Sequence, residues 1–152
     1  MNINRDKLEK TRKMGKEALL WSEVAVGMHD LAILAYKNNK GPAWNNIIVS
    51  LARKSVLNFV RAVRAAYGKL TISFSDQPRI ILSNLGDIGL ITDRKAEFDY
   101  LFENADLPFG DEKTFTQQQV DTVLETEESL RIYLSGRLAK RLQENQKEAL
   151  GG

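Results

Sequence analysis

The stretch that decides the fold is AWNNIIVSLARKSVLNFVRAVRAAY, residues 43–67. Its apolar side chains recur at three- and four-residue steps, the period of one face of an α-helix. Pro42 before it suits the first turn of a helix, and Gly68 after it suits a left-handed C-terminal cap. Because the apolar surface covers more than half of the circumference, we expect a central helix that packs on two neighbours within the domain or crosses a subunit interface.

A long helix is predicted on each side of this segment. Residues 1–17 form a charged helical arm that Asn4 can cap. The arm continues into an apolar stripe that we expect to face the core, made of Leu20, Val24, Met28, Leu31 and Ala35. Towards the other end of the chain, Thr116 and Gln119 form a capping box that opens a helix over residues 117–149. Its heptad-like stripe predicts self-association through Val123, Leu130, Leu134 and Leu138.

The region between the last two long helices carries a strand pattern and a short helical pattern. Residues 70–83 alternate as two strands around a turn and predict a β-hairpin. Asp93 is the expected cap of a short helix that ends near Glu103. The sequence therefore predicts a mainly α fold with a minor β part, in one domain over residues 1–152. It contains three long helices, one short helix and a small inserted β-hairpin.

Composition limits the class of protein. Of the 152 residues, 43% are apolar and 28% are charged, which is typical of a globular chain, and cysteine is absent. The lack of cysteine excludes disulfides and thiolate chemistry and suits a reducing compartment. The first 17 residues lack the apolar run of a secretory signal. The apolar window 18–36 contains Glu23, His29 and Asp30, which are costly in lipid, so we expect a core helix, no membrane contact and a cytoplasmic location.

Charge is distributed unevenly along the chain. Residues 31–75 contain seven basic and no acidic residues, whereas residues 76–130 contain thirteen acidic and four basic residues. On the central helix, cationic and amide side chains recur opposite the apolar stripe, and arginine with asparagine can contact phosphates and base edges. The predicted polyanion-binding residues are Arg53, Lys54, Asn58, Arg61, Arg64 and Lys69. The alternative is that this face meets solvent, or the acidic half of the same chain or of a neighbouring copy.

Patterns typical of catalysis are weak. His29 is the only histidine, and we expect it to be a partly buried polar residue on the first long helix. No Gly-rich phosphate loop or nucleophile elbow occurs. Asp121, Glu125 and Glu128 share one helix face and could hold a divalent ion for an enzyme, but one helix cannot surround such an ion, so no metal or cofactor is predicted.

Two functions fit these patterns best, and neither is enzymatic. The first is a self-associating helical module that binds nucleic acid or another polyanion through the basic face of its central helix. The second is an assembly component, such as a structural subunit or an inhibitor of another protein, whose basic and acidic halves meet across subunits. Both predict a homo-oligomer, and an acidic protein or a nucleic acid as the further partner.

Overall fold

The computed structural model describes residues 4–69, 85–86, 89, 93–102 and 114–151. Its helices are α1 (Arg5–Lys37), α2 (Pro42–Ala66), α4 (Lys95–Leu101) and α5 (Gln117–Ala149). Among the helices whose bounds the structure describes, three are long and one is short, as predicted, and the mainly helical class is confirmed. Within the described residues there is no strand, and the predicted hairpin over residues 70–83 lies outside them.

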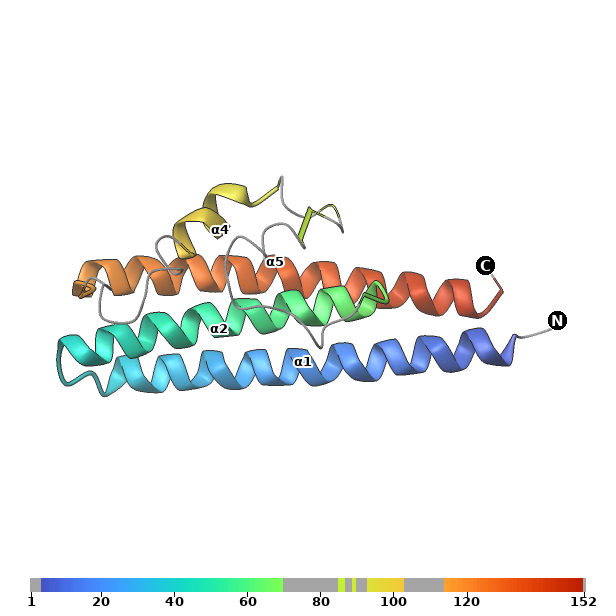
Figure 1. The fold of residues 1–152 in the computed structure, drawn as a ribbon, viewed down its shortest axis with the longest axis horizontal. Coiled ribbons are helices and arrows are strands. Elements are labelled where there is room, and N and C mark those ends of the chain that lie inside the picture. Colours follow the sequence, from blue (N-terminus) through green and yellow to red (C-terminus); the bar gives the residue numbers. More distant parts are fainter. Residues whose placement is uncertain (1–3, 70–84, 87–88, 90–92, 103–113, 152) are drawn as a thin grey trace.

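The three long helices form an elongated arrangement with α2 in the middle (Figure 1). α1 runs away from the chain termini, α2 returns antiparallel to it, and α5 runs in the same direction as α2. α1 and α5 both pack mainly on α2 and also contact each other directly, and α4 contacts α5. The start of α1 and the end of α5 therefore lie at the same end of the molecule, and α2 ends before it, in the same half (Figure 1).

Local capping chemistry fixes the ends of the long helices as predicted. The Asn4 side chain accepts a hydrogen bond from the Lys7 backbone N–H at 3.2 Å. Thr116 and Gln119 make both hydrogen bonds of a capping box. Pro42 occupies the first turn of α2, and Gly68 adopts a φ of 75° beyond its end.

The cap predicted for the short helix was wrong. Arg94 occupies the N-cap position of α4 without a side-chain hydrogen bond, and the helix ends at Leu101. Asp93 instead accepts a hydrogen bond from the Tyr133 hydroxyl at 2.9 Å. A carboxylate that is drawn to a tertiary partner on α5 cannot cap the turn next to it.

The core face of α1 also differs from the prediction. Leu20 and Leu31, expected to be inside, are 57% and 51% exposed. The buried residues are all alanines, namely Ala18, Ala25, Ala32 and Ala35, and the first three recur every seven residues. Short side chains let two helix backbones approach closely, so α1 packs on α2 through its smallest residues and turns several of its largest ones outwards.

The α5 stripe predicted to meet another chain lies in the core of its own chain. Val123, Leu130, Leu134 and Leu138 are between 0% and 7% exposed. They belong to one cluster with Phe98 of α4 and the buried apolar residues of α2. From Ser55 to Ala66, every α2 residue except Arg61 is buried, which agrees with a central helix covered on several sides.

Candidate functional site

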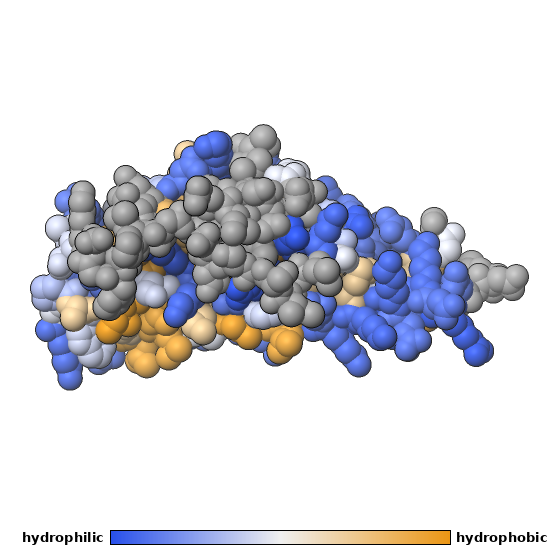
Figure 2. Space-filling view, viewed as in Figure 1, coloured by the Kyte–Doolittle hydropathy of each residue, from blue (hydrophilic) through white to orange (hydrophobic). Residues whose placement is uncertain are grey.

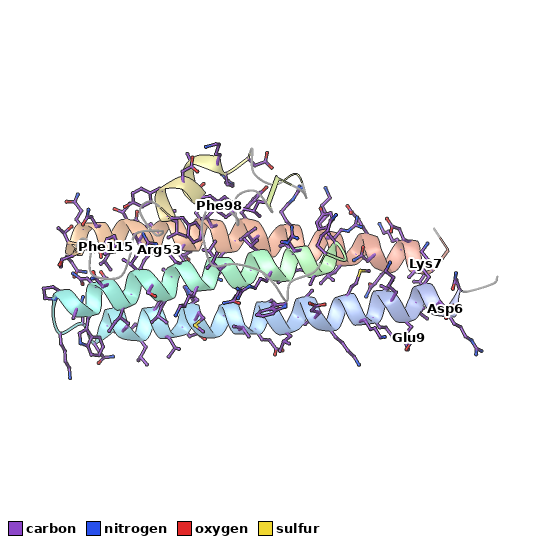
Figure 3. All side chains as sticks on the ribbon, viewed as in Figure 1. Asp6, Lys7, Glu9, Arg53, Phe98 and Phe115 are labelled. Atoms are coloured by element: carbon purple, nitrogen blue, oxygen red, sulfur yellow. The ribbon has the colours of Figure 1, made fainter. Side chains whose placement is uncertain are left out.

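The fold gathers basic residues at the end of the molecule where the termini lie. The segments 4–17, 61–69 and 131–151 together contain fourteen basic and five acidic residues, a net charge of +9. The other described residues contain six basic and nine acidic residues, a net charge of −3. Asp6, Lys7 and Glu9 mark this basic end in Figure 3, and its surface is mostly hydrophilic in Figure 2. The charge asymmetry along the sequence thus becomes a separation of charge along the long axis.

Three lysines meet where α1 begins and α2 ends. Lys10, Lys13 and Lys69 line a hollow of about 200 Å³ together with Met14 and Glu17. All three lysine side chains are exposed. The Lys69 backbone N–H donates to the Arg64 carbonyl at 3.0 Å, which places this lysine directly beyond the last turn of α2. We call these residues the lysine cluster.

The other side of the α1 start carries a second basic group. Arg5, Arg12, Lys13 and Lys16 line a shallow hollow of about 580 Å³ along the first three turns, with Leu8 and Glu9. The high proportion of cations in residues 4–17 was visible in the sequence. Its closeness to Lys69 was not, because that contact joins the two ends of an antiparallel helix pair.

The residues predicted to bind a polyanion are not all on the surface. Lys54 and Lys69 are exposed, Arg53 and Arg61 are half-buried, and the buried pair is Asn58 and Arg64, 5% and 7% exposed. The continuous basic face expected along α2 is therefore reduced to exposed lysines at separate places. What the sequence pattern suggested was a solvent face is therefore partly buried in the folded chain.

The half-buried arginines of α2 take part in internal packing. Arg53 Nε donates to the Leu101 carbonyl at 2.8 Å, and its guanidinium lies 5.6 Å from the centre of the Phe115 ring (Figure 3). Arg61 donates to Asn58 Oδ1 at 3.0 Å and lies 5.1 Å from the centre of the Trp21 ring. Arginine combines an apolar stem with a planar cation, so it can fill such a boundary without being a ligand site.

A buried polar centre joins all three long helices. Glu127 of α5 is fully buried and accepts hydrogen bonds from His29 Nδ1 of α1 at 2.9 Å and from Ser55 Oγ of α2 at 3.0 Å. His29 is 18% exposed, as its prediction as a partly buried residue requires. The carboxylate lies between the imidazole and the hydroxyl, whereas in a serine hydrolase triad the imidazole has that position. The contacts are those of a structural centre that fixes the relative placement of the helices.

The acidic residues considered for a divalent ion do not converge. The Asp121 carboxylate accepts hydrogen bonds from the Tyr36 hydroxyl at 2.7 Å and from Gln117 at 3.2 Å. Glu128 is paired with Arg131 at 3.8 Å, and Glu125 is exposed. In the part of the chain that the structure describes, no group of three or more potential metal ligands comes together.

A second surface of interest is the outer side of α1. Figure 2 shows a hydrophobic patch along the α1 edge, on the half of the helix away from the termini. Its large side chains are 44% to 58% exposed, and we call them the α1 apolar face: Leu19, Leu20, Val26, Leu31 and Leu34. By length and composition alone α1 could cross a membrane, and most of its apolar stretch is unburied. Glu23 and Asp30, both exposed, lie on the same side of the helix.

The basic end and the α1 apolar face are thus two surfaces whose composition departs from an ordinary soluble surface. No protein-family model, curated protein or solved structure matches this chain. The first surface is cationic and suits an anionic partner, and the second is apolar with charges along it and suits a helix of matching pattern.

Two tyrosines give the folded protein a dependence on alkaline pH. The hydrogen bond to Asp121, and the charge of that carboxylate, raise the pKa of Tyr36 above its usual 10.0. Burial, and then the bond to Asp93, raise the pKa of Tyr133 above the same value. A raised folded-state pKa means that the neutral phenol is favoured by folding, so this stability is complete below pH 10 and is lost as the pH rises through the folded-state pKa.

We therefore expect the Tyr36→Phe/Tyr133→Phe variant to lose less stability than the wild type between about pH 10 and pH 11.5. The measurement is the melting temperature by circular dichroism across this range. The exposed Tyr100→Phe is the control and keeps the wild-type profile. If the melting temperatures of the double variant and the wild type fall equally with rising pH, the two tyrosines are not the source of the pH dependence.

Proposed function

We propose that this protein is a non-enzymatic helical module that binds nucleic acid through its basic end. The observation that supports it is the gathering of basic residues from α1, α2 and α5 in one half of the molecule, with the lysine cluster exposed where α2 ends beside α1. Among the described residues, Lys10, Lys13 and Lys69 form no ion pair. No described residue neutralises their charges, which supports their role as contacts for a ligand.

The size and electrostatics of this end suit a phosphate backbone. Neighbouring packed helices lie roughly 8–10 Å apart, so three of them present roughly 20 Å of cationic surface, enough for several successive phosphates. The helix C-termini of α2 and α5 carry partial negative charge, which stabilises the lysines and arginines around them in the absence of a ligand. Binding driven by phosphate contacts is largely independent of base sequence and weakens steeply with salt.

The test is a fluorescence anisotropy titration of a labelled 20-base-pair DNA duplex and of the matching RNA, at several salt concentrations. For Lys10→Ala/Lys13→Ala/Lys69→Ala we expect about tenfold weaker binding at low salt. We also expect the slope of log affinity against log salt to fall by about 2–3, because each lost phosphate contact contributes about 0.9.

The control removes the same charge elsewhere. Lys37, Lys40 and Lys54 are exposed, and the first two lie at the far end of α1 and just beyond it. Lys37→Ala/Lys40→Ala/Lys54→Ala is expected to bind within about threefold of the wild type. If this control weakens binding more than the lysine-cluster variant does, the site lies along the central helix instead. If the wild type binds neither duplex, the function is wrong.

A second function, that of an assembly component, is supported by a different observation. The α1 apolar face exposes large side chains that a monomer has no reason to keep on its surface. The separation of charge along the long axis also favours contact between opposite ends of two copies. This function does not require nucleic acid.

A further inference from the structure

We propose that the α1 apolar face pairs with the α1 apolar face of a second copy of this chain, with the two helices antiparallel. This inference deepens the assembly function above and is independent of nucleic-acid binding. The apolar face extends from Leu19 to Leu34, about 22 Å along the helix axis at a rise of 1.5 Å per residue. The α1 helix of a second copy has the same length and the same apolar residues. In a symmetric dimer the same surface of each copy forms the interface, so this face can pair with itself.

The charges along this face decide between the two possible orientations. Five charged residues recur along α1 at seven-residue intervals: Glu9, Lys16, Glu23, Asp30 and Lys37. This spacing places them on one side of the helix, with charges in the order minus, plus, minus, minus, plus. A parallel pair places each of these charges beside its own copy, which is repulsive at every position. An antiparallel pair does not.

A two-fold axis at Glu23 gives the complementary register. Lys16 lies seven residues before Glu23 and Asp30 seven residues after it, so Lys16 of each copy faces Asp30 of the other. Glu9 and Lys37, each fourteen residues from the axis, form a second pair of opposite charges. Only the two Glu23 side chains meet as like charges. In the described part of the chain none of these five residues forms an ion pair, so all are available to a partner.

The same register brings the first part of the two apolar faces together, whereas Leu31 and Leu34 lie level with Gly15 and Arg12 of the second copy. It places Leu20 level with Val26 of the second copy, and Leu19 level with Gly27. Gly27 is exposed, and a side chain added there would find no atom within 4 Å, so its backbone leaves room for a leucine of the second copy.

A lipid surface is the other occupant that an exposed apolar helix suggests. Glu23 and Asp30 lie within the apolar face, and an anionic bilayer would repel them while its apolar part would leave them without partners. A helix that supplies Lys16 opposite Asp30 neutralises that charge. The charge pattern therefore favours the second copy.

The test is sedimentation equilibrium of the full chain at low salt, over a range of concentrations. A single pair of helices that meet over about 22 Å buries less surface than a tight complex does. We therefore expect a dimer with a dissociation constant in the micromolar range. Leu19→Gln/Leu31→Gln is expected to weaken dimerisation at least tenfold. Ile132→Gln, which changes a 61% exposed residue of α5, is the matched control and leaves it unchanged.

Charge reversal tests the orientation and the register. Lys16→Glu and Asp30→Lys each create two repulsive contacts in a homodimer, and each is expected to weaken it about tenfold. An equimolar mixture of the two variants forms only attractive pairs and should dimerise as the wild type does. Within one chain these residues are about 21 Å apart along the helix, so recovery on mixing can only come from contact between chains.

Three results would overturn the proposal. The first is a protein that stays monomeric to about millimolar concentration, and the second is a dimer that is indifferent to Lys16→Glu, Asp30→Lys and their mixture. The third is a monomer that binds vesicles of anionic lipid and loses this binding in Leu19→Gln/Leu31→Gln, which would assign the face to a membrane. The lysine-cluster variant should dimerise normally, so failure of this proposal and failure of nucleic-acid binding are seen separately.

Discussion

Replacing Glu127 by alanine is expected to lower the free energy of unfolding by about 3–5 kcal/mol, the range for removing one partner of a buried charged contact. The carboxylate is fully buried and accepts hydrogen bonds from His29 and Ser55, which come from two different helices. Its removal leaves Ser55 Oγ, in a fully buried residue, without an acceptor and opens a space where the side chain was. Urea denaturation followed by circular dichroism measures the change.

Two further variants test whether the loss of stability comes from the charge of Glu127 or from the volume of its side chain. Glu127→Gln keeps the shape and one carbonyl oxygen for Ser55, so we expect a smaller loss of about 1–2 kcal/mol. Glu125→Ala changes an exposed glutamate on the same helix and should stay within about 0.5 kcal/mol of the wild type. A loss below about 1 kcal/mol for Glu127→Ala would mean that the cost of burying the carboxylate cancels its hydrogen bonds.

The second large effect is expected at Ala25, in the interface between α1 and α2. Ala25 is fully buried and has Ala18 and Ala32 seven residues away on either side. Leucine adds three carbon atoms where two helices are packed through small residues, so the helices must separate or adopt strained side-chain rotamers. We expect Ala25→Leu to cost about 2–3 kcal/mol, towards the upper end of typical overpacking costs.

Chemical denaturation also measures this prediction, with Ala139→Leu as the matched control. Ala139 is exposed on α5, so the same chemical change there should alter stability by about 0.5 kcal/mol or less. If Ala25→Leu is equally neutral, α1 does not rest on α2 through its alanines. Large residues of α1 such as Leu20 and Leu31, which belong to the predicted stripe, would then form its core face.

The sequence by itself determined where most of the helices begin and end. Asn4, Pro42, Gly68 and the pair Thr116 and Gln119 act on backbone groups within a few residues of themselves. Such interactions depend mainly on neighbouring residues, so they can be inferred without a fold. Asp93 was the exception, because its carboxylate found a tertiary partner in Tyr133.

Only the tertiary structure decided which side of each helix is covered. Periodicity located an apolar stripe on α1, but it weighs side chains by size and hydrophobicity, whereas close helix packing selected the alanines. The same limit applies to α2, where Arg61 and Arg64 carried the pattern of a solvent face and yet lie half-buried and buried. Burial is a property of two surfaces together, and one segment of sequence contains only one of them.

The candidate sites follow the same division. The excess of cations in residues 4–17 and 31–75 was plain in the sequence, and so was His29 as a half-buried residue. The meeting of Lys10 and Lys13 with Lys69, and of His29 with Glu127, depends on the direction in which each helix runs. These residues are far apart in the sequence. They become neighbours only because the chain reverses between α1 and α2, and because α5 packs beside both helices.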